Sequence, residues 1–269
     1  MTNTQVGQVD DGDRWKSRLR RACRILVERG PLEILRQMRR HGLRESARFV
    51  GRNLRYMLAI AISRRFDRRY GVDTGGEIPS DRLQVIGEHA RQGAFFLSTP
   101  ARSFLRTLES LPDDLGAFAF VDFGCGKGRA LLLAAASRNF RRVVGVEHAP
   151  ALVAVANRNI EAWRGARRCR DVRAICADAA CFELPPEPCV LYFFAPFDPP
   201  VLDAVLAGVA ASFRTRPRPI CAIYVAASDE VLPDEAMLAA GFRRRMPLPA
   251  LRPDPGAARR LQYALYEMA

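Results

Sequence analysis

The sequence predicts an α/β protein built on a doubly wound, mostly parallel sheet of seven strands. Over the C-terminal two thirds of the chain, apolar strand-like stretches alternate with helix-forming ones, which is typical of a parallel sheet covered on both faces. A glycine-rich turn joins the first of these strands to the first helix. The last two strands are separated by a proline-rich segment without helical pattern, so we expect them to form an antiparallel hairpin.

The elements of this sheet follow in order along the chain. A helix from Ala101 to Leu111 is expected ahead of the first strand, after a loop at 96–100. The strands and helices are identified from apolar runs, β-branched and aromatic content, and helical periodicity. We expect strands near 118–123, 143–147, 172–177, 189–194, 220–226, 242–247 and 260–267, and helices near 128–138, 150–163, 199–213 and 230–240.

Residues 1–69 are predicted to be a basic, α-helical N-terminal extension, followed by the α/β domain at 70–269. The first 12 or so residues are polar and acidic, and we expect them to be disordered. The arginine-rich segment 64–76 is interpreted as a basic turn that enters a glycine-rich loop at the domain boundary. Ahead of it, apolar residues recur at helical spacing, and such a stripe either packs on its own domain or lies on an anionic membrane; the clearest stripe is Trp15, Leu19, Cys23 and Leu26.

The positive charge of the chain is concentrated near its N-terminus. Of the formal net charge of +13, residues 1–72 contribute +11, from 18 Arg and Lys against 7 Asp and Glu. Lysine occurs only at Lys16 and Lys127, so arginine supplies nearly all of this charge. Two explanations stay open: an arginine bias of the whole composition, or an anionic partner such as nucleic acid or a membrane surface.

Hydropathy and cysteine content bear on location and on metals. The sequence has no run of 18 apolar residues, and its polar, acidic start is unlike a signal peptide, so a cytoplasmic location is expected. The seven cysteines are scattered without a C-x-x-C pair, and the three histidines lie far apart. We therefore expect no metal site and no disulfide framework, but buried free thiols.

The glycine turn is the most informative stretch of the sequence. Glycines at 124, 126 and 128 follow a buried strand and open a helix, so the backbone can turn tightly and approach a ligand closely. A phosphate-binding P-loop would need Ser or Thr after Lys127, where Gly128 stands, and a dinucleotide fingerprint would need glycine at Arg129. The pattern present is acid-x-Gly-x-Gly-x-Gly, beginning at Asp122. A second acid, Glu147, ends the next strand, where a carboxylate can accept both hydroxyls of a ribose.

This pattern resembles the first motif of the class I S-adenosylmethionine (SAM) methyltransferases, and the predicted sheet resembles their fold over residues 70–269. The resemblance implies SAM as cofactor, with the backbone of Gly124, Cys125, Gly126 and Gly128 along its methionine moiety. It further implies that Asp122 orients the amino group, Glu147 binds the ribose with His148 beside it, Asp178 accepts from the adenine amino group, and the Ala179 backbone meets the adenine ring. For Asp178, a helix or turn cap is the alternative. Lys127 is expected to cap the helix or lie in solvent.

The loop after the fourth strand is where many methyltransferases of this family hold the methyl acceptor. Here the loop matches the Asn/Asp-Pro-Pro-Tyr/Phe pattern of amino-methylating members only at Pro196 and Phe197, and it faintly resembles Asn-Asn-Phe-Ala-Phe of the non-SET histone-lysine enzymes. Ala195 lacks the amide on which both patterns rely, which argues against amine methylation. Phe194 is predicted to line the cofactor site, and Ala195, Pro196 and Phe197 the acceptor pocket; core packing is the alternative for both phenylalanines.

The sequence thus predicts a SAM-dependent methyltransferase whose acceptor, a protein side chain or a small molecule, is not identified. No general base is recognisable, so the catalytic residues stay open. Two alternatives remain: a SAM-binding protein without transfer activity, and a nucleotide-binding oxidoreductase, which the absent third glycine disfavours.

Overall fold

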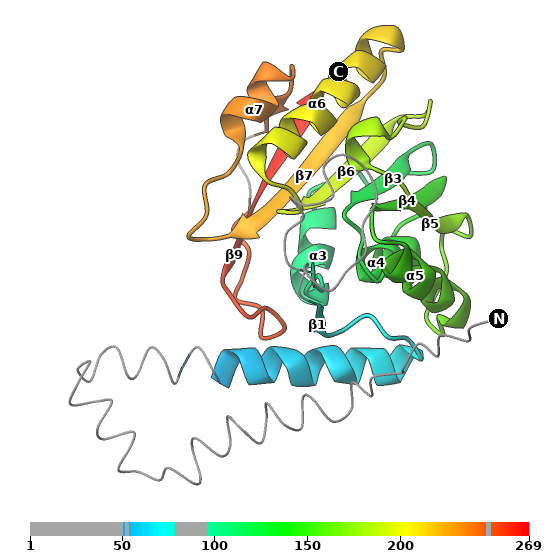
Figure 1. Cartoon of the computed structure of the whole chain (residues 1–269), viewed down its shortest axis with the longest axis vertical. Helices are drawn as coiled ribbons and strands as arrows, with labels where there is room; N and C mark the ends of the chain where they lie inside the picture. The colour runs from blue at the N-terminus through cyan, green and yellow to red at the C-terminus, as the bar shows by residue number, and fades with distance from the viewer. Residues whose placement is uncertain (1–50, 52–53, 79–95, 246–248, 269) are drawn as a thin grey trace, which may run out of the picture. The chain divides into compact units, whose positions relative to one another are not determined.

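The protein is represented by a computed structural model that describes residue 51 and residues 54–78, 96–245 and 249–268 (Figure 1). The predictions for residues 1–50, including the disordered start and the stripe at Trp15, lie outside the described residues. Packing groups Arg55–Ala269 into one compact unit, so residues 55–69 belong with the sheet by their contacts. The predicted division of the chain between residues 69 and 70 stays a prediction.

The core of this unit is a seven-stranded sheet in the order β5-β4-β3-β6-β7-β9-β8 (Figure 1). The first five strands in this order are parallel, while β9 runs antiparallel to both β7 and β8. The mostly parallel sheet and the antiparallel C-terminal hairpin are therefore confirmed. The strands are β3 (Ala119–Phe123), β4 (Arg142–Glu147), β5 (Val172–Cys176), β6 (Cys189–Phe194), β7 (Ile220–Ala227), β8 (Arg243–Arg244) and β9 (Leu261–Met268).

The helices follow the predicted order; α3, α4, α5 and α7 are shorter than expected, whereas α6 extends to Thr215, beyond its expected end near residue 213. Helix α4 begins at Arg129, one residue after the expected start, because Gly128 takes a left-handed conformation at the N-cap. Helix α7 is shorter than expected because Pro233 stands at its N-cap. The elements are α3 (Ala101–Leu108), α4 (Arg129–Ser137), α5 (Pro150–Ala162), η3 (Ala179–Cys181), α6 (Pro199–Thr215) and α7 (Asp234–Ala239).

A second, two-stranded sheet was not predicted. Strand β1 (Glu77–Ile78) pairs antiparallel with β2 (Phe96–Leu97). Each strand has only two residues, too few for a periodic pattern in the sequence. Their pairing depends on the chain returning to the same place, which only the folded structure reveals.

Two apolar clusters cover the two faces of the large sheet. The first contains side chains from α3, α4 and α5, and the second contains side chains from α6 and α7. Strand β3 is buried along its whole length and alternates between them, with Phe120 in the first cluster and Val121 and Phe123 in the second. Each fully buried large apolar side chain stabilises the fold by roughly 1.5–3 kcal/mol, so the central strands anchor the loops at their carboxyl ends.

A helix over residues 54–70, here called helix 54–70, packs against the first cluster. The Tyr70 ring stacks on Trp163 with centroids 4.3 Å apart, and Phe66 lies 4.8 Å from Tyr70. The predicted basic turn at 64–76 is therefore wrong in its first half, which is helical up to residue 70. The reason is tertiary: Phe66 and Tyr70 share one helix face, and burying that face against Trp163 outweighs the arginine run.

The structure also bears on the predictions for thiols, membrane spans and metal sites. Cys125, Cys169 and Cys189 are buried free thiols as expected, but Cys176 and Cys181 are exposed, because the strand end and the 3-10 turn that carry them face solvent. Within the described ranges, no helix is long and apolar enough to span a bilayer. The same ranges contain no cluster of three or more potential metal ligands, and the expected absence of a metal stays a prediction.

Candidate cofactor site at the carboxyl ends of the strands

The glycine turn lies between β3 and α4 and requires glycine on conformational and steric grounds. Gly124, Gly126 and Gly128 all have positive φ, at 76°, 54° and 83°, a region that favours glycine. A Cβ at Gly124 would lie 2.8 Å from the Cβ of Pro196, so the turn touches the loop after β6. The intervening Cys125 is buried, and burial raises the pKa of its thiol well above the ordinary value, so this residue packs rather than reacts.

Glu147 ends β4 beside this turn and is almost fully buried. Its Oε2 accepts from the backbone N–H of Gly126 at 3.0 Å, and its Oε1 accepts from the N–H of Ala149 at 3.0 Å. The Nδ1 atom of His148 also lies 3.0 Å from Oε1. A carboxylate accepts about four hydrogen bonds, so at least one acceptor position remains for a ribose hydroxyl. The sequence missed the second role of Glu147, which is to hold the glycine turn against β4.

Asp122, in β3, is a buried carboxyl group that makes no hydrogen bond within the described part of the chain. Burial, together with the nearby charge of Glu147, raises the pKa of Asp122 to about 8. A buried acid without a partner beside the turn fits a cationic group, such as the amino group of a methionine moiety.

The raised pKa of Asp122 predicts a specific dependence of stability on pH. In the unfolded chain the group has its ordinary pKa of 3.8, so between about pH 4 and 8 the folded state holds a proton that the unfolded state releases. The contribution of Asp122 to folding stability is therefore complete below pH 4 and is lost as pH rises through 8, by at most about 1.4 kcal/mol per pH unit.

The measurement is a series of thermal melts of wild type and Asp122→Asn between pH 5 and 9, without cofactor. Asparagine has no proton to lose, so the melting temperature of the variant should rise relative to wild type as pH increases, and the difference should level off above pH 8. Parallel curves would show that Asp122 titrates normally.

The side predicted to bind adenine lies at the ends of β4 and β5. The backbone N–H of Ala177 donates to the carbonyl of Glu147 at 3.1 Å, which brings the two strand ends together. Asp178 caps the 3-10 turn η3 by accepting from the N–H of Ala180 at 3.0 Å. Asp178 therefore acts as a turn cap, and its role toward adenine stays a prediction. Asp178 and Ala179 are both partly exposed at this edge.

The loop after β6 divides between the two faces of the sheet. Phe194 packs against the first cluster, whereas Ala195 and Phe197 pack against the second, on the side of α6 and α7. Pro196 touches the glycine turn at Gly124. Ala195 has φ of +37°, a conformation strained for alanine and more usual for Asn or Gly. The predicted acceptor residues are therefore not gathered on one wall, and among them Pro196 touches the turn.

Lys127, expected at a helix cap or in solvent, is instead buried. Its Nζ donates to both carboxylate oxygens of Asp73, at 3.1 and 3.2 Å, and to the carbonyl of Gly75 at 3.0 Å. Asn159 of α5 donates to the carbonyls of Asp73 and Lys127 and accepts from the N–H of Asp73. The segment after helix 54–70 is thereby held against the glycine turn.

Arg129, the first residue of α4, is also buried, and the sequence analysis assigned it no role. Its guanidinium donates to Thr74 Oγ1 at 2.7 Å and to Ser63 Oγ at 2.6 Å, and it lies 3.4 Å from Asp67. It also lies over the ring of Phe66, 4.9 Å from the centroid. Burial lowers the pKa of this guanidinium, and Asp67 opposes that shift. The only signal in the sequence is a pair of basic residues inside a glycine turn, which does not distinguish burial from exposure.

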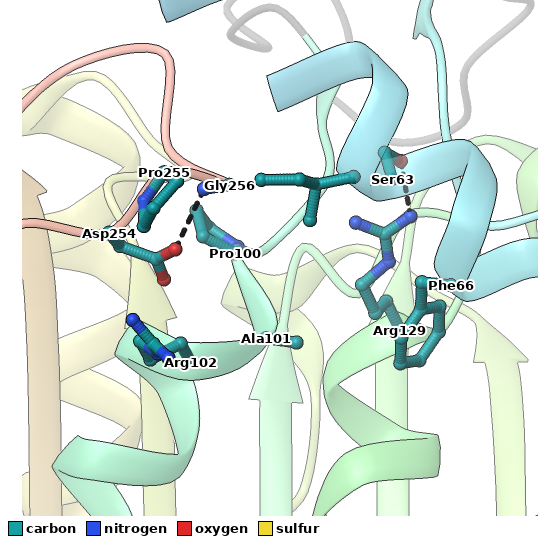
Figure 2. A pocket seen from close by; sticks show the side chains of 10 residues that line it. Ser63, Phe66, Pro100, Ala101, Arg102, Arg129, Asp254, Pro255 and Gly256 are labelled. Atoms are coloured by element: carbon teal, nitrogen blue, oxygen red, sulfur yellow. Dashed lines mark hydrogen bonds between the residues drawn. The ribbon is translucent and has the colours of Figure 1, made fainter. Parts of the chain in front are cut away.

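A pocket of about 270 Å³ adjoins Arg129 (Figure 2). Figure 2 shows it between helix 54–70, the start of α3, the N-terminal end of α4 and the loop before β9. Asp254 shapes one side by accepting from Ser103 N–H at 2.7 Å and from Gly256 N–H at 2.8 Å. Half of the ten lining residues are apolar: Ile62, Phe66, Pro100, Ala101 and Pro255.

Comparison with known proteins gives one family match and many distant structural likenesses. Residues 120–215, about a third of the chain, match the family described as "Methyltransferase domain". No curated protein matches the sequence. The solved structures it resembles include the [4+2]-cyclase SpnF, at 19% identity, TM-score 0.42, and coverage of 54% of this chain and 57% of that one.

Two further structures are similarly distant. A mutant of MtNAS in complex with S-adenosylmethionine has 20% identity and TM-score 0.44, with 61% of each chain covered. A SAM-dependent methyltransferase from Aquifex aeolicus has 14% identity and TM-score 0.44, with coverage of 64% of this chain and 94% of that one. The chain spans only about three fifths of the length of SpnF and MtNAS. At these TM-scores, the likenesses say nothing about activity.

The family match covers β3, the glycine turn, Glu147 and β6, and it coincides with the strand order and the site described above. Residues 120–215 are therefore similar to a methyltransferase domain, and they carry the glycine turn, Asp122 and Glu147.

Proposed function

We propose that the protein transfers the methyl group of SAM to an acceptor that is a protein side chain or a small molecule. The observation that carries this proposal is the buried pair of acids around the glycine turn: among the described residues the Asp122 carboxyl has no hydrogen-bond partner, and Glu147 holds Gly126 with acceptor capacity to spare. An ammonium group and a ribose are the complements of these two carboxylates. These residues fit SAM, and the further sites at His148, Asp178, Ala179 and Phe194 stay part of the proposal.

When bound, SAM supplies an electrophilic methyl group on a sulfonium. The residues of the chain would act by positioning: Glu147 fixes the ribose, Asp122 receives the amino group, and the bare backbone of the turn allows the methionine moiety to lie close. Apolar walls such as Phe194 would exclude water from the reacting atoms. None of these steps requires a general base, which suits an acceptor that is nucleophilic without one.

The acceptor is proposed to approach from the side of the pocket in Figure 2. Phe194 at the end of β6 belongs to the same cluster as Ala101 and Phe66, which line that pocket. Arg129 connects the pocket to the turn, since it directly follows Gly128. The pocket is smaller than the roughly 300–1,000 Å³ typical of drug-sized ligands, which favours a small molecule or a single side chain.

The experiment is a thermal-shift titration with S-adenosylhomocysteine (SAH), the demethylated product of SAM, and with NAD(P). SAH at about 100 times its dissociation constant should stabilise the fold by about 2.7 kcal/mol, whereas NAD(P) should cause no shift. Stabilisation by NAD(P) alone would favour the oxidoreductase and contradict the proposal. Binding of SAH without turnover of labelled SAM, across a broad panel of acceptors, would instead favour the SAM-binding protein without transfer activity.

Two expectations from the sequence remain proposals. A cytoplasmic location is one of them; the described residues contain no helix that is long and apolar enough to span a bilayer. Binding of nucleic acid or an anionic membrane through the basic residues 1–69 concerns residues that are mostly outside the described ones.

A further inference from the structure

The segment Asp73–Gly76, which lies outside every motif of the site, is held against the glycine turn from three directions. Lys127 reaches it from the turn, Asn159 from α5, and Asp67 from helix 54–70 through the N–H of Gly75 at 2.9 Å. The backbone N–H and carbonyl of Asp73 are both bonded to Asn159, and those of Gly75 to Asp67 and Lys127. The segment is therefore fixed before any ligand arrives.

The two glycines of this segment allow it to pass close to its neighbours. A Cβ at Gly75 would lie 2.7 Å from Ser63 Oγ, too close for any side chain. Gly76 has φ of +89°, and the position of its Cβ would be 4.0 Å from Lys127 Nζ. The segment therefore runs beside the side chain that projects from the centre of the turn.

The charges in this arrangement are unusual for a merely structural contact. The Lys127 side chain is 7% exposed, while the carboxylate-bearing side chain of Asp73 is 71% exposed. Burying an ammonium costs free energy that a largely exposed partner repays only in part. The pair thus brings one accessible carboxylate to a fixed place beside the turn.

We propose that Asp73–Gly76 forms the outer wall of the cofactor site at its methionine end, with Lys127 as the positioning residue that holds this wall. The proposal rests on the proposed function, because the glycine turn is taken to carry the methionine moiety. In addition to Asp122, the Asp73 carboxylate is then a second acceptor for the amino group. The wall thereby selects ligands that carry an amino-acid tail.

The experiment compares two ligands on three variants by calorimetry. SAH has the amino-acid tail, whereas methylthioadenosine keeps the adenosine and the sulfur but lacks the tail. Lys127→Met frees the wall, so SAH affinity should fall about tenfold or more while methylthioadenosine affinity changes less than about twofold. Asp73→Asn removes the charge paired with Lys127 but keeps an oxygen that can accept from Nζ, so at a temperature where the variant is folded it should show the same selectivity with a smaller loss. Lys127→Arg should restore part of the SAH affinity.

Arg218→Met provides the matched control. Arg218 is a buried cation with several hydrogen bonds to the carbonyls of Pro185, Glu187 and Ser212, remote from the turn in sequence and contacts. Its loss should lower the melting temperature without changing either affinity of the folded protein. Equal losses for both ligands in Lys127→Met and Asp73→Asn, or no loss in either, would overturn the proposal. If wild type binds neither ligand, the proposed function itself fails.

Discussion

Replacing Arg129 by methionine is expected to lower the free energy of unfolding by about 3–5 kcal/mol, because it leaves buried partners without the cation that they surround. The Asp67 side chain is only 16% exposed, and Thr74 is fully buried. For a domain of this size, the melting temperature should fall by about 10 °C. Helix 54–70 should loosen first, since Ser63 and Asp67 are its polar links to α4.

Hydrogen exchange would check this result directly. In Arg129→Met, amides of helix 54–70 should lose protection before those of β3 and β6. Arg129→Lys is the matched variant: it keeps the charge but has a compact ammonium group in place of the five-donor fork, so it should fall between wild type and methionine. A methionine variant that melts like wild type would show that the network contributes nothing to stability.

Replacing Glu147 by alanine should weaken SAH binding at least about tenfold, since charge-assisted hydrogen bonds to the ribose are worth about 1.5–3 kcal/mol. The structure adds a second cause, because the buried N–H of Gly126 loses its acceptor and the turn is no longer held against β4. We therefore expect the loss to exceed that from the ribose contacts alone.

Calorimetry with SAH, at a temperature where the variant is fully folded, measures this effect. Glu147→Gln separates the two causes. Its amide oxygen can still accept from Gly126 N–H or from a ribose hydroxyl, but its NH₂ faces a second donor, so an intermediate affinity is expected. Unchanged SAH affinity in Glu147→Ala would contradict the assignment of this carboxylate to the cofactor.

Much of the α/β sheet could be predicted from the sequence, because local patterns determine it. The strands at Ala119–Phe123 and Cys189–Phe194 are continuous apolar runs, and glycine and proline mark their ends. The antiparallel hairpin followed from a proline-rich connection in which no crossover helix could form. The positions of Asp122 and Glu147 at the carboxyl ends followed in the same way, because parallel strands end at one edge.

Only the tertiary structure decided what surrounds that edge. The sequence placed residues 64–70 in a turn and Lys127 at a cap or in solvent. In the fold, residues 64–70 are helical and Lys127 is buried. Both depend on partners far along the chain, such as Trp163 for Tyr70 and Asp73 for Lys127. A residue's neighbours in the sequence carry no information about a contact made with a residue more than 50 positions away. The polarity of Lys127 therefore suggested exposure, whereas the fold buries it with a partner.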